Sequence, residues 1–184
     1  MGSIGIVLAG GRSTRMGRGR DKALLPWQGR PLIERQIAVL RAAGADPVHV
    51  SGNRPAYDGI PDAIPGAGPL SGLASVAAIC PDAELLVIPV DMPRLSAALL
   101  RRLRGDARRA GCLRFAEHVL PMRLRWDGRC RAILDALMQP ADPRLRSLRA
   151  LQQRIGVDEL ELSADDAMEL IDCNTEDVWK MANR

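Results

Sequence analysis

The chain is poor in aromatic residues, and this scarcity bears on the kind of partner it can bind. Only five aromatic side chains are spread over 184 residues, although the formal net charge is +4. Proteins that bind single-stranded nucleic acid need closely spaced aromatic rings on which bases stack. No helix-turn-helix, zinc-finger or ribonucleoprotein motif accompanies the positive charge either. The composition therefore argues against nucleic acid as a partner and favours a small polyanionic ligand.

Long apolar runs are also missing. The sequence has no leading apolar segment of the signal-peptide type and no run long enough to span a membrane. We therefore expect a cytoplasmic protein that does not associate with a membrane. The oligomeric state does not follow from the sequence, and a monomer is the working expectation.

The four cysteines lack the spacing of a metal site. They are widely scattered and include no C-x-x-C pair: Cys80, Cys112, Cys130 and Cys173. This pattern argues against structural zinc and favours reduced thiols that act as small buried hydrophobic residues.

The two histidines lack the spacing of a nucleophilic site. His49 lies in an apolar segment and His118 opens another. Neither has a serine, cysteine or acid at a spacing typical of nucleophilic catalysis, so we expect a structural role for both.

Short apolar runs alternate with longer helical patterns along most of the chain, which is typical of βαβ units and a mostly parallel sheet. Strands are predicted at 4–8, 48–50, 85–90, 118–126, 157–162 and 168–171. Helices are predicted at 32–40, 72–79, 95–103, 131–138 and 145–154, with Thr175 capping a further one. Because no repeat or linker interrupts this order, we expect one domain over residues 1–184.

The segment from Leu8 to Gly17 is the most informative part of the sequence. A buried strand ends in Leu8-Ala9-Gly10-Gly11, and a basic loop follows that contains Arg15 and leads to Lys22. Glycines let backbone N–H groups approach phosphate closely, and the cations neutralise its oxygens. The segment matches neither the P-loop nor the dinucleotide motif. A glycine turn beside a solvated basic patch is the alternative interpretation.

Asp91 is the candidate metal ligand. It follows the uncharged run 85–90 and precedes Met92-Pro93. Open α/β sheets bind ligands at the carboxyl ends of their strands, and the proline delays the start of the next helix. A carboxylate there that faces a triphosphate needs an intervening cation, and Mg²⁺ takes one or two carboxylates plus phosphate oxygens. The alternative is an aspartate that caps the next helix.

The pattern LAGGRSTRMG…DK…GRPL resembles the opening of nucleotidyltransferases with a GT-A-like fold, and within them the molybdenum cofactor guanylyltransferases. The resemblance implies a three-layer α/β/α sandwich with a mostly parallel, Rossmann-like central sheet, of the nucleotide-diphospho-sugar transferase type. It also implies that residues 1–94 bind nucleotide and residues 95–184 bind the acceptor. One departure is the three-residue spacer between Gly17 and Asp21, where the family often has one or two residues.

The resemblance also implies roles for individual residues. It implies catalytic roles for Arg15, Lys22 and Asp91, with Asp91 as the ligand of magnesium. The implied nucleotide-binding residues are Leu8, Ala9, Gly10, Gly11, Lys22, Asn53, Asp62 and Asp91, of which Asp62 matches only with a one-residue gap. Two further segments resemble family motifs, Gly68-Pro-Leu-Ser-Gly72 and Asp172-Cys-Asn174. Asp172 could add charge to the metal site or be an ordinary residue at a strand end.

The implied activity is transfer of GMP from GTP to the terminal phosphate of molybdopterin, with release of pyrophosphate. Proteins that deliver molybdopterin and chaperones of molybdoenzymes are the implied protein partners. The Ala9-Gly10-Gly11 form favours the guanylyl over the cytidylyl enzyme, which usually reads A-A-G there. The sequence is also compatible with a sugar-phosphate nucleotidylyltransferase of the same fold and with a catalytically silent nucleotide-binding regulator.

Overall fold

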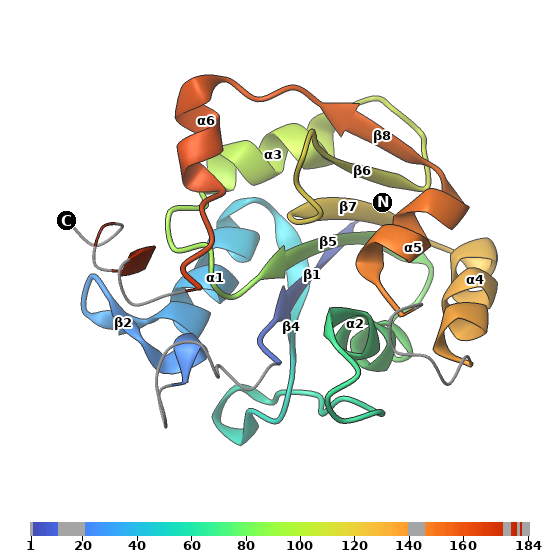
Figure 1. Cartoon of the computed structure of the whole chain (residues 1–184), viewed down its shortest axis with the longest axis horizontal. Helices are drawn as coiled ribbons and strands as arrows, with labels where there is room; N and C mark the ends of the chain where they lie inside the picture. Colours follow the sequence, from blue (N-terminus) through green and yellow to red (C-terminus); the bar gives the residue numbers. More distant parts are fainter. Residues whose placement is uncertain (1, 11–20, 140–145, 175–177, 180, 182–184) are drawn as a thin grey trace.

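Six strands form one sheet in the order β4-β1-β5-β7-β6-β8 in the computed structural model (Figure 1). The structure describes residues 2–10, 21–139, 146–174, 178, 179 and 181. The strands of the sheet are β1 Ser3–Leu8, β4 Ala45–Ser51, β5 Ala83–Pro89, β6 Cys112–Phe115, β7 Met122–Trp126 and β8 Val157–Leu160. Only β7 of these six runs against the others, so the expected mostly parallel sheet is confirmed.

Helices cover both faces of the sheet, and a small hairpin stands beside it (Figure 1). The α-helices are α1 Leu32–Ala42, α2 Pro69–Ala77, α3 Ala97–Gly105, α4 Gly128–Met138, α5 Leu148–Ile155 and α6 Ala164–Glu169. Two short 3-10 turns, η2 Lys22–Leu24 and η3 Pro55–Tyr57, and the hairpin β2 Pro26–Trp27 with β3 Arg30–Pro31 lie in the connections. None of the helices in the described residues is long and apolar enough to cross a membrane.

Alternation along the central strands divides the apolar side chains between two cores. In β5, Leu86 and Ile88 pack with α1 and α3, whereas Leu85 and Val87 pack with α2, α4 and α5. Successive side chains of a strand point to opposite faces, so a strand buried on both faces reads as a continuous apolar run. This explains why the uncharged run around β5 was readable from the sequence, and it confirms the three-layer sandwich.

The turn between β6 and β7 corrects one predicted strand. The strand expected at 118–126 begins only at Met122, and His118 lies in the turn rather than in a strand. The turn is stabilised locally because the N–H of His118 donates to the carbonyl of Phe115 at 3.1 Å. The preceding strand β6 was not predicted, since its four residues give too short a pattern.

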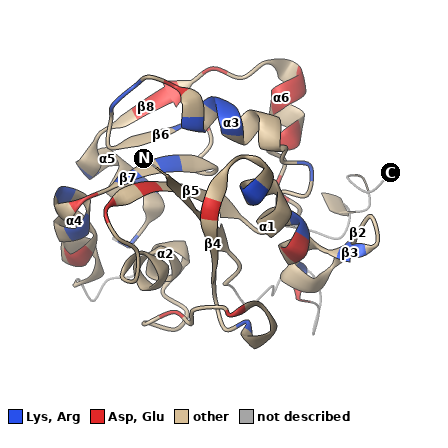
Figure 2. Cartoon of the chain, turned by 180° about the vertical axis from the view of Figure 1, so that it is seen from behind, with Lys and Arg blue, Asp and Glu red and all other residues tan. Residues whose placement is uncertain are grey.

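The second correction concerns residues 168–171, which were expected to form a strand. Met168 and Glu169 end helix α6, which begins after a capping box between Ser163 and Asp166. Arg102 of α3 pairs with Asp166, and the N–H of Ser96 donates to Glu169 at 3.0 Å. Figure 2 shows the basic residues of α3 next to the acidic residues of α6. The capping box and these contacts stabilise a helix at residues for which the apolar spacing alone predicted a strand.

The expected burial of the cysteines is confirmed. All four are buried and free. Burial raises the pKa of the Cys112 thiol and of the Cys130 thiol to about 12, and that of Cys173 to about 11. Thiols held protonated in this way are poor nucleophiles.

Candidate active site at the carboxyl edge of the sheet

Three parallel strands end together at one edge of the sheet. Leu8, the last residue of β1, pairs with Ser51 of β4 and with Pro89 of β5. Gly52 follows β4 with φ +115°, and a Cβ there would lie 3.0 Å from the backbone nitrogen of Gly10. A glycine is required at this point because the backbones after β1 and β4 pass so close to each other.

Asp62 lies against the glycine backbone that follows β1. A Cβ on Gly10 would be 3.4 Å from a carboxylate oxygen of Asp62, and Ser51 Oγ donates to Asp62 at 3.5 Å. Gly72 of α2 closes the other side, since a Cβ there would meet Ser51 Oγ at 2.2 Å and Asp62 at 3.2 Å. Burial raises the pKa of Asp62, and the hydrogen bond from Ser51 opposes that shift. The structure thus places Asp62, whose match to the family motif needed a one-residue gap, against Gly10.

Arg54 ties the glycine backbone to the segment that carries Lys22. Its Nη2 donates to the carbonyl of Ala9 at 3.0 Å, and its Nη1 lies 2.6 Å from Asp21. Asp21 in turn caps η2, accepting from the N–H of Ala23 at 3.1 Å. These contacts fix Lys22, the first residue of η2, relative to the end of β1. Sequence reasoning missed Arg54, whose only signal is an arginine four residues after the strand predicted at 48–50.

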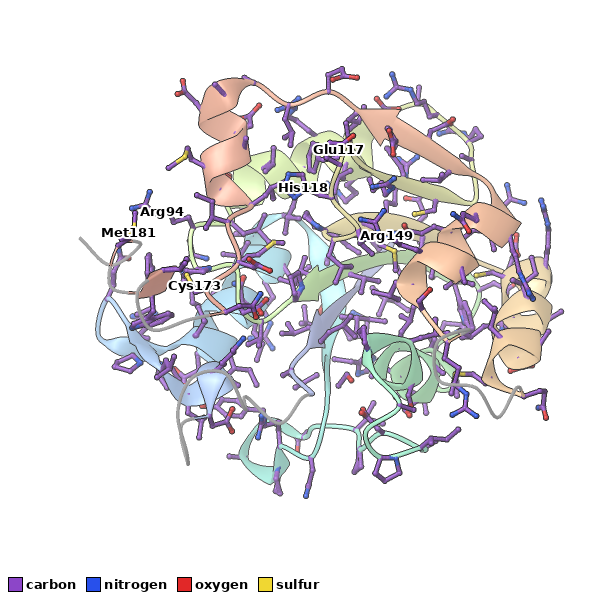
Figure 3. The ribbon with its side chains drawn as sticks, in the orientation of Figure 1. Arg94, Glu117, His118, Arg149, Cys173 and Met181 are labelled. Atoms are coloured by element: carbon purple, nitrogen blue, oxygen red, sulfur yellow. The ribbon has the colours of Figure 1, made fainter. Side chains whose placement is uncertain are left out.

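Lys22 meets Asp91 at the centre of the edge. Its Nζ lies 3.6 Å from Asp91 Oδ2 and donates a hydrogen bond to Asn174 Oδ1. Asn174 Nδ2 donates to Asp172, and the N–H of Cys173 donates to the carbonyl of Asp91 at 2.8 Å. Three segments far apart in the sequence therefore converge here, and Asp172 belongs to the cluster rather than to a strand end. Cys173, labelled in Figure 3, marks where the last of them reaches the site.

The surroundings of Asp91 disfavour the negative charge of its carboxylate. Its side chain is 21% exposed. Burial raises its pKa, Lys22 opposes the shift, and the neighbouring charge of Asp172 adds to it. A buried carboxylate beside a second carboxylate is stabilised by a cation. Among the described residues, no three His, Cys, Asp or Glu side chains group together to enclose a metal. Asp91 and Asp172 supply the one or two carboxylates that a divalent ion such as Mg²⁺ takes, the rest of its shell being phosphate oxygens and water.

The predicted site residues fall into three groups. Asn53 is exposed in the loop after β4, and its side chain makes no hydrogen bond to the rest of the described chain. Gly11 and Arg15 lie outside the described residues. Leu8, Ala9, Gly10, Lys22, Asp62 and Asp91 all lie along the one sheet edge.

An open, mostly parallel sheet with glycine-rich backbone, a lysine and carboxylates at its carboxyl edge places this chain among the α/β nucleotide-binding proteins. A model of the MobA-like NTP transferase domain matches residues 5–157, and the chain belongs to this family of nucleotidyltransferases. It is 52% identical over 176 residues to the molybdenum cofactor guanylyltransferase of Xanthomonas euvesicatoria pv. vesicatoria (strain 85-10), covering 95% of this chain and 91% of that protein.

Solved structures share the fold at low identity. The molybdopterin-guanine dinucleotide biosynthesis protein A of Archaeoglobus fulgidus matches with a TM-score of 0.75 at 18% identity, covering 97% of this chain and 96% of that one. A Mycobacterium tuberculosis protein solved in complex with manganese matches with a TM-score of 0.66 at 20% identity, covering 100% of this chain and 98% of that one.

Proposed function

We propose that this protein transfers GMP from GTP to the terminal phosphate of molybdopterin, releasing pyrophosphate. The observation that carries the proposal is the convergence of Lys22, Asp91 and Asn174 at the sheet edge next to the Gly10 backbone. The resemblance to the guanylyltransferase of Xanthomonas supports the choice of nucleotide and acceptor. Residues up to about 94 bind the nucleotide in this proposal, and those that follow bind the acceptor.

The acceptor needs no general base. A phosphate monoester has a second pKa of ~6 and is already mostly dianionic at neutral pH. One of its oxygens forms a bond to the α-phosphorus of GTP while the bond from that phosphorus to the bridging oxygen of the β-phosphate breaks. The electron pair leaves with pyrophosphate. The enzyme's task is to align two polyanions and to offset their repulsion.

Lys22 suits the side of the site on which negative charge accumulates. Its ammonium is placed by the cap at Asp21 and by Asn174, and it stabilises charge on the departing pyrophosphate. Arg15, seven residues before Lys22 in the sequence, contributes a second cation in this proposal. Mg²⁺ would be held by Asp91 with Asp172 beside it, and when bound it would supply further positive charge to the phosphates. The Mycobacterium tuberculosis protein of the same fold was solved in complex with manganese, which supports a divalent ion as cofactor.

Guanine recognition is assigned to the other side of the edge. Guanine presents N1–H and an exocyclic amine as donors and O6 as an acceptor. The carboxylate of Asp62 can accept from the donors, and the backbone at residues 8–10 and the side chain of Asn53 supply the remaining polar partners. Once a bound nucleotide buries these groups, leaving one of them unpaired costs about 1–3 kcal/mol, which is the basis for rejecting ATP.

The test is a direct competition. Purified protein is given GTP, CTP, UTP and ATP together with Mg²⁺ and either molybdopterin or a sugar phosphate as acceptor, and the product is identified by mass spectrometry. The proposal expects the guanine dinucleotide. A cytosine product would replace the guanylyl assignment, product formed only with a sugar phosphate as acceptor would indicate the sugar-phosphate transferase, and GTP binding without turnover would indicate a regulator.

A further inference from the structure

A pocket of about 500 Å³ opens beside Asp91 on the side away from the glycine-rich backbone. It is lined by the end of β5, the β6–β7 turn and the segment after α6: Pro89, Asp91, Met92, Glu117, His118, Val119, Leu120, Ala167, Leu170, Ile171 and Asp172. Since it shares Asp91 and Asp172 with the proposed metal site, a molecule in it would lie against the α-phosphate of a bound nucleotide.

The charges of the pocket are unbalanced. Three of its lining side chains are carboxylates, and His118 is the one lining side chain in the described part of the chain that carries a nitrogen. The rest of the wall is apolar. A phosphate monoester that enters must overcome three negative charges, so any donor it meets there has a large effect on its position.

The backbone of His118 is held from several sides. Arg114 Nη1 donates to the carbonyl of His118 at 2.7 Å, and Gln152 Nε2 donates to the carbonyl of Val119 at 2.8 Å. Glu117 occupies φ +64°, a conformation that residues with a side chain rarely adopt. Figure 3 shows Glu117 and His118 side by side at this turn.

The imidazole itself is uncommitted. It is half-buried and makes no hydrogen bond or ion pair with another side chain in the ranges that the structure describes. A rigid turn that fixes the backbone of a histidine and leaves its ring at a pocket wall is an arrangement suited to contact with a ligand.

We infer that His118 binds the phosphate of the acceptor, donating a hydrogen bond from its ring to a phosphate oxygen that does not react. The inference rests on the proposed function and replaces the structural role expected for this histidine from the sequence. An imidazole has an N–H to donate in either protonation state. Unlike a lysine or arginine, it adds no permanent cation that would compete with a metal for Asp91 and Asp172.

The test compares variants of His118 with a variant of His49, the other histidine of the chain. His118→Ala removes the donor, and His118→Gln replaces it with an amide N–H. His49→Ala is the matched control on β4, an outermost strand of the sheet that is separated from β7 by β1 and β5. Initial rates are measured with molybdopterin varied at saturating GTP and with GTP varied at saturating molybdopterin. Equilibrium dialysis gives the Kd for molybdopterin separately.

We expect His118→Ala to raise the KM and Kd for molybdopterin by about tenfold to hundredfold, the range for one hydrogen bond to a charged group. The KM for GTP should stay unchanged, His118→Gln should recover part of the loss, and His49→Ala should behave as wild type. Because His118→Gln retains the size and polarity of the side chain, it keeps the test valid if the alanine variant folds poorly.

Two results would overturn the inference. One is an unchanged KM and Kd for molybdopterin in both His118 variants. The other is an equal loss for GTP and molybdopterin with no rescue by glutamine, which is the pattern of a structural role. Failure of the proposed function is read separately, because wild-type protein would then form no product with molybdopterin at all.

Discussion

Lys22 donates a hydrogen bond to Asn174, a residue 152 positions further along the chain. This contact joins η2, near the beginning of the chain, to the segment after α6 and leaves the ammonium 3.6 Å from Asp91. The lysine, its neighbouring carboxylate and the amide that orients it therefore come from three separate segments. Substitutions in this cluster and in the backbone that supports it have distinct expected effects.

Lys22→Ala should lower kcat by about a hundred- to a thousandfold, because it removes a fixed charge that stabilises the transition state. Lys22→Arg should recover part of that loss, since a planar fork replaces a point charge. Steady-state kinetics with GTP and molybdopterin measure both, and Arg30→Ala, an exposed cation on β3, is the control. A change confined to the KM for GTP would mean that Lys22 only anchors the nucleotide.

Asp91→Asn should abolish transfer and yet stabilise the fold in the absence of divalent ions. Because burial and Asp172 raise the pKa of Asp91, the folded state favours the neutral carboxyl. Between the ordinary aspartate range and this raised pKa, the folded state binds more protons than the unfolded state, so wild-type stability falls as pH rises. Thermal unfolding in EDTA at neutral pH should give a higher Tm for Asp91→Asn than for wild type.

The same experiment has a second arm. Added Mg²⁺ with GTP should raise the Tm of wild type and of the control Asp135→Asn, an exposed position on α4, more than that of Asp91→Asn. The wild-type rate should also fall as the pH decreases, and this fall should begin at a higher pH than it would with an aspartate of ordinary pKa. Equal stabilisation of all three proteins by the ion would remove Asp91 from the metal site.

Nucleotide choice should depend on Asp62. Wild type should prefer GTP over ATP by about tenfold to a hundredfold in kcat/KM, and CTP should be poorer still. Asp62→Ala and Asn53→Ala should each narrow the preference between GTP and ATP more than they lower the maximal rate with GTP. Competition assays with paired nucleotides measure this ratio, and an unchanged ratio in both variants would place guanine recognition elsewhere.

Gly72→Ala should destabilise the protein by about 1–3 kcal/mol, since a methyl group would lie 2.2 Å from Ser51 Oγ and force α2 away from β4. It should also weaken GTP binding, because Asp62 lies against the same position. Gly105→Ala, at the end of α3, meets no atom within 4 Å and should be neutral or stabilising by about 0.4–1 kcal/mol. Denaturant unfolding and calorimetric titration with GTP compare the two; similar unfolding free energies would contradict the tight packing at Gly72.

Much of the fold was determined by the sequence alone. The uncharged run around β5 and the apolar run of β1 predict buried central strands, because a strand covered on both faces has no polar side to present. The position of Asp91 after β5 follows from the same pattern, since the carboxyl end of such a strand is where a polar side chain first reaches solvent. The glycines after Leu8 predict a phosphate-binding backbone, because residues without a Cβ let backbone N–H groups approach phosphate oxygens closely.

Only the tertiary structure decided the rest. The meeting of Lys22 with Asn174, the contact of Arg54 with Ala9, and the approach of Asp62 to Gly10 join residues whose separation in the chain carries no signal. His118 read as the start of a strand because apolar residues follow it, but hydrogen bonds from Arg114 and to Phe115 hold it in a turn at the pocket wall. Local patterns record which side chains must be buried, whereas long-range packing decides which polar groups face one another.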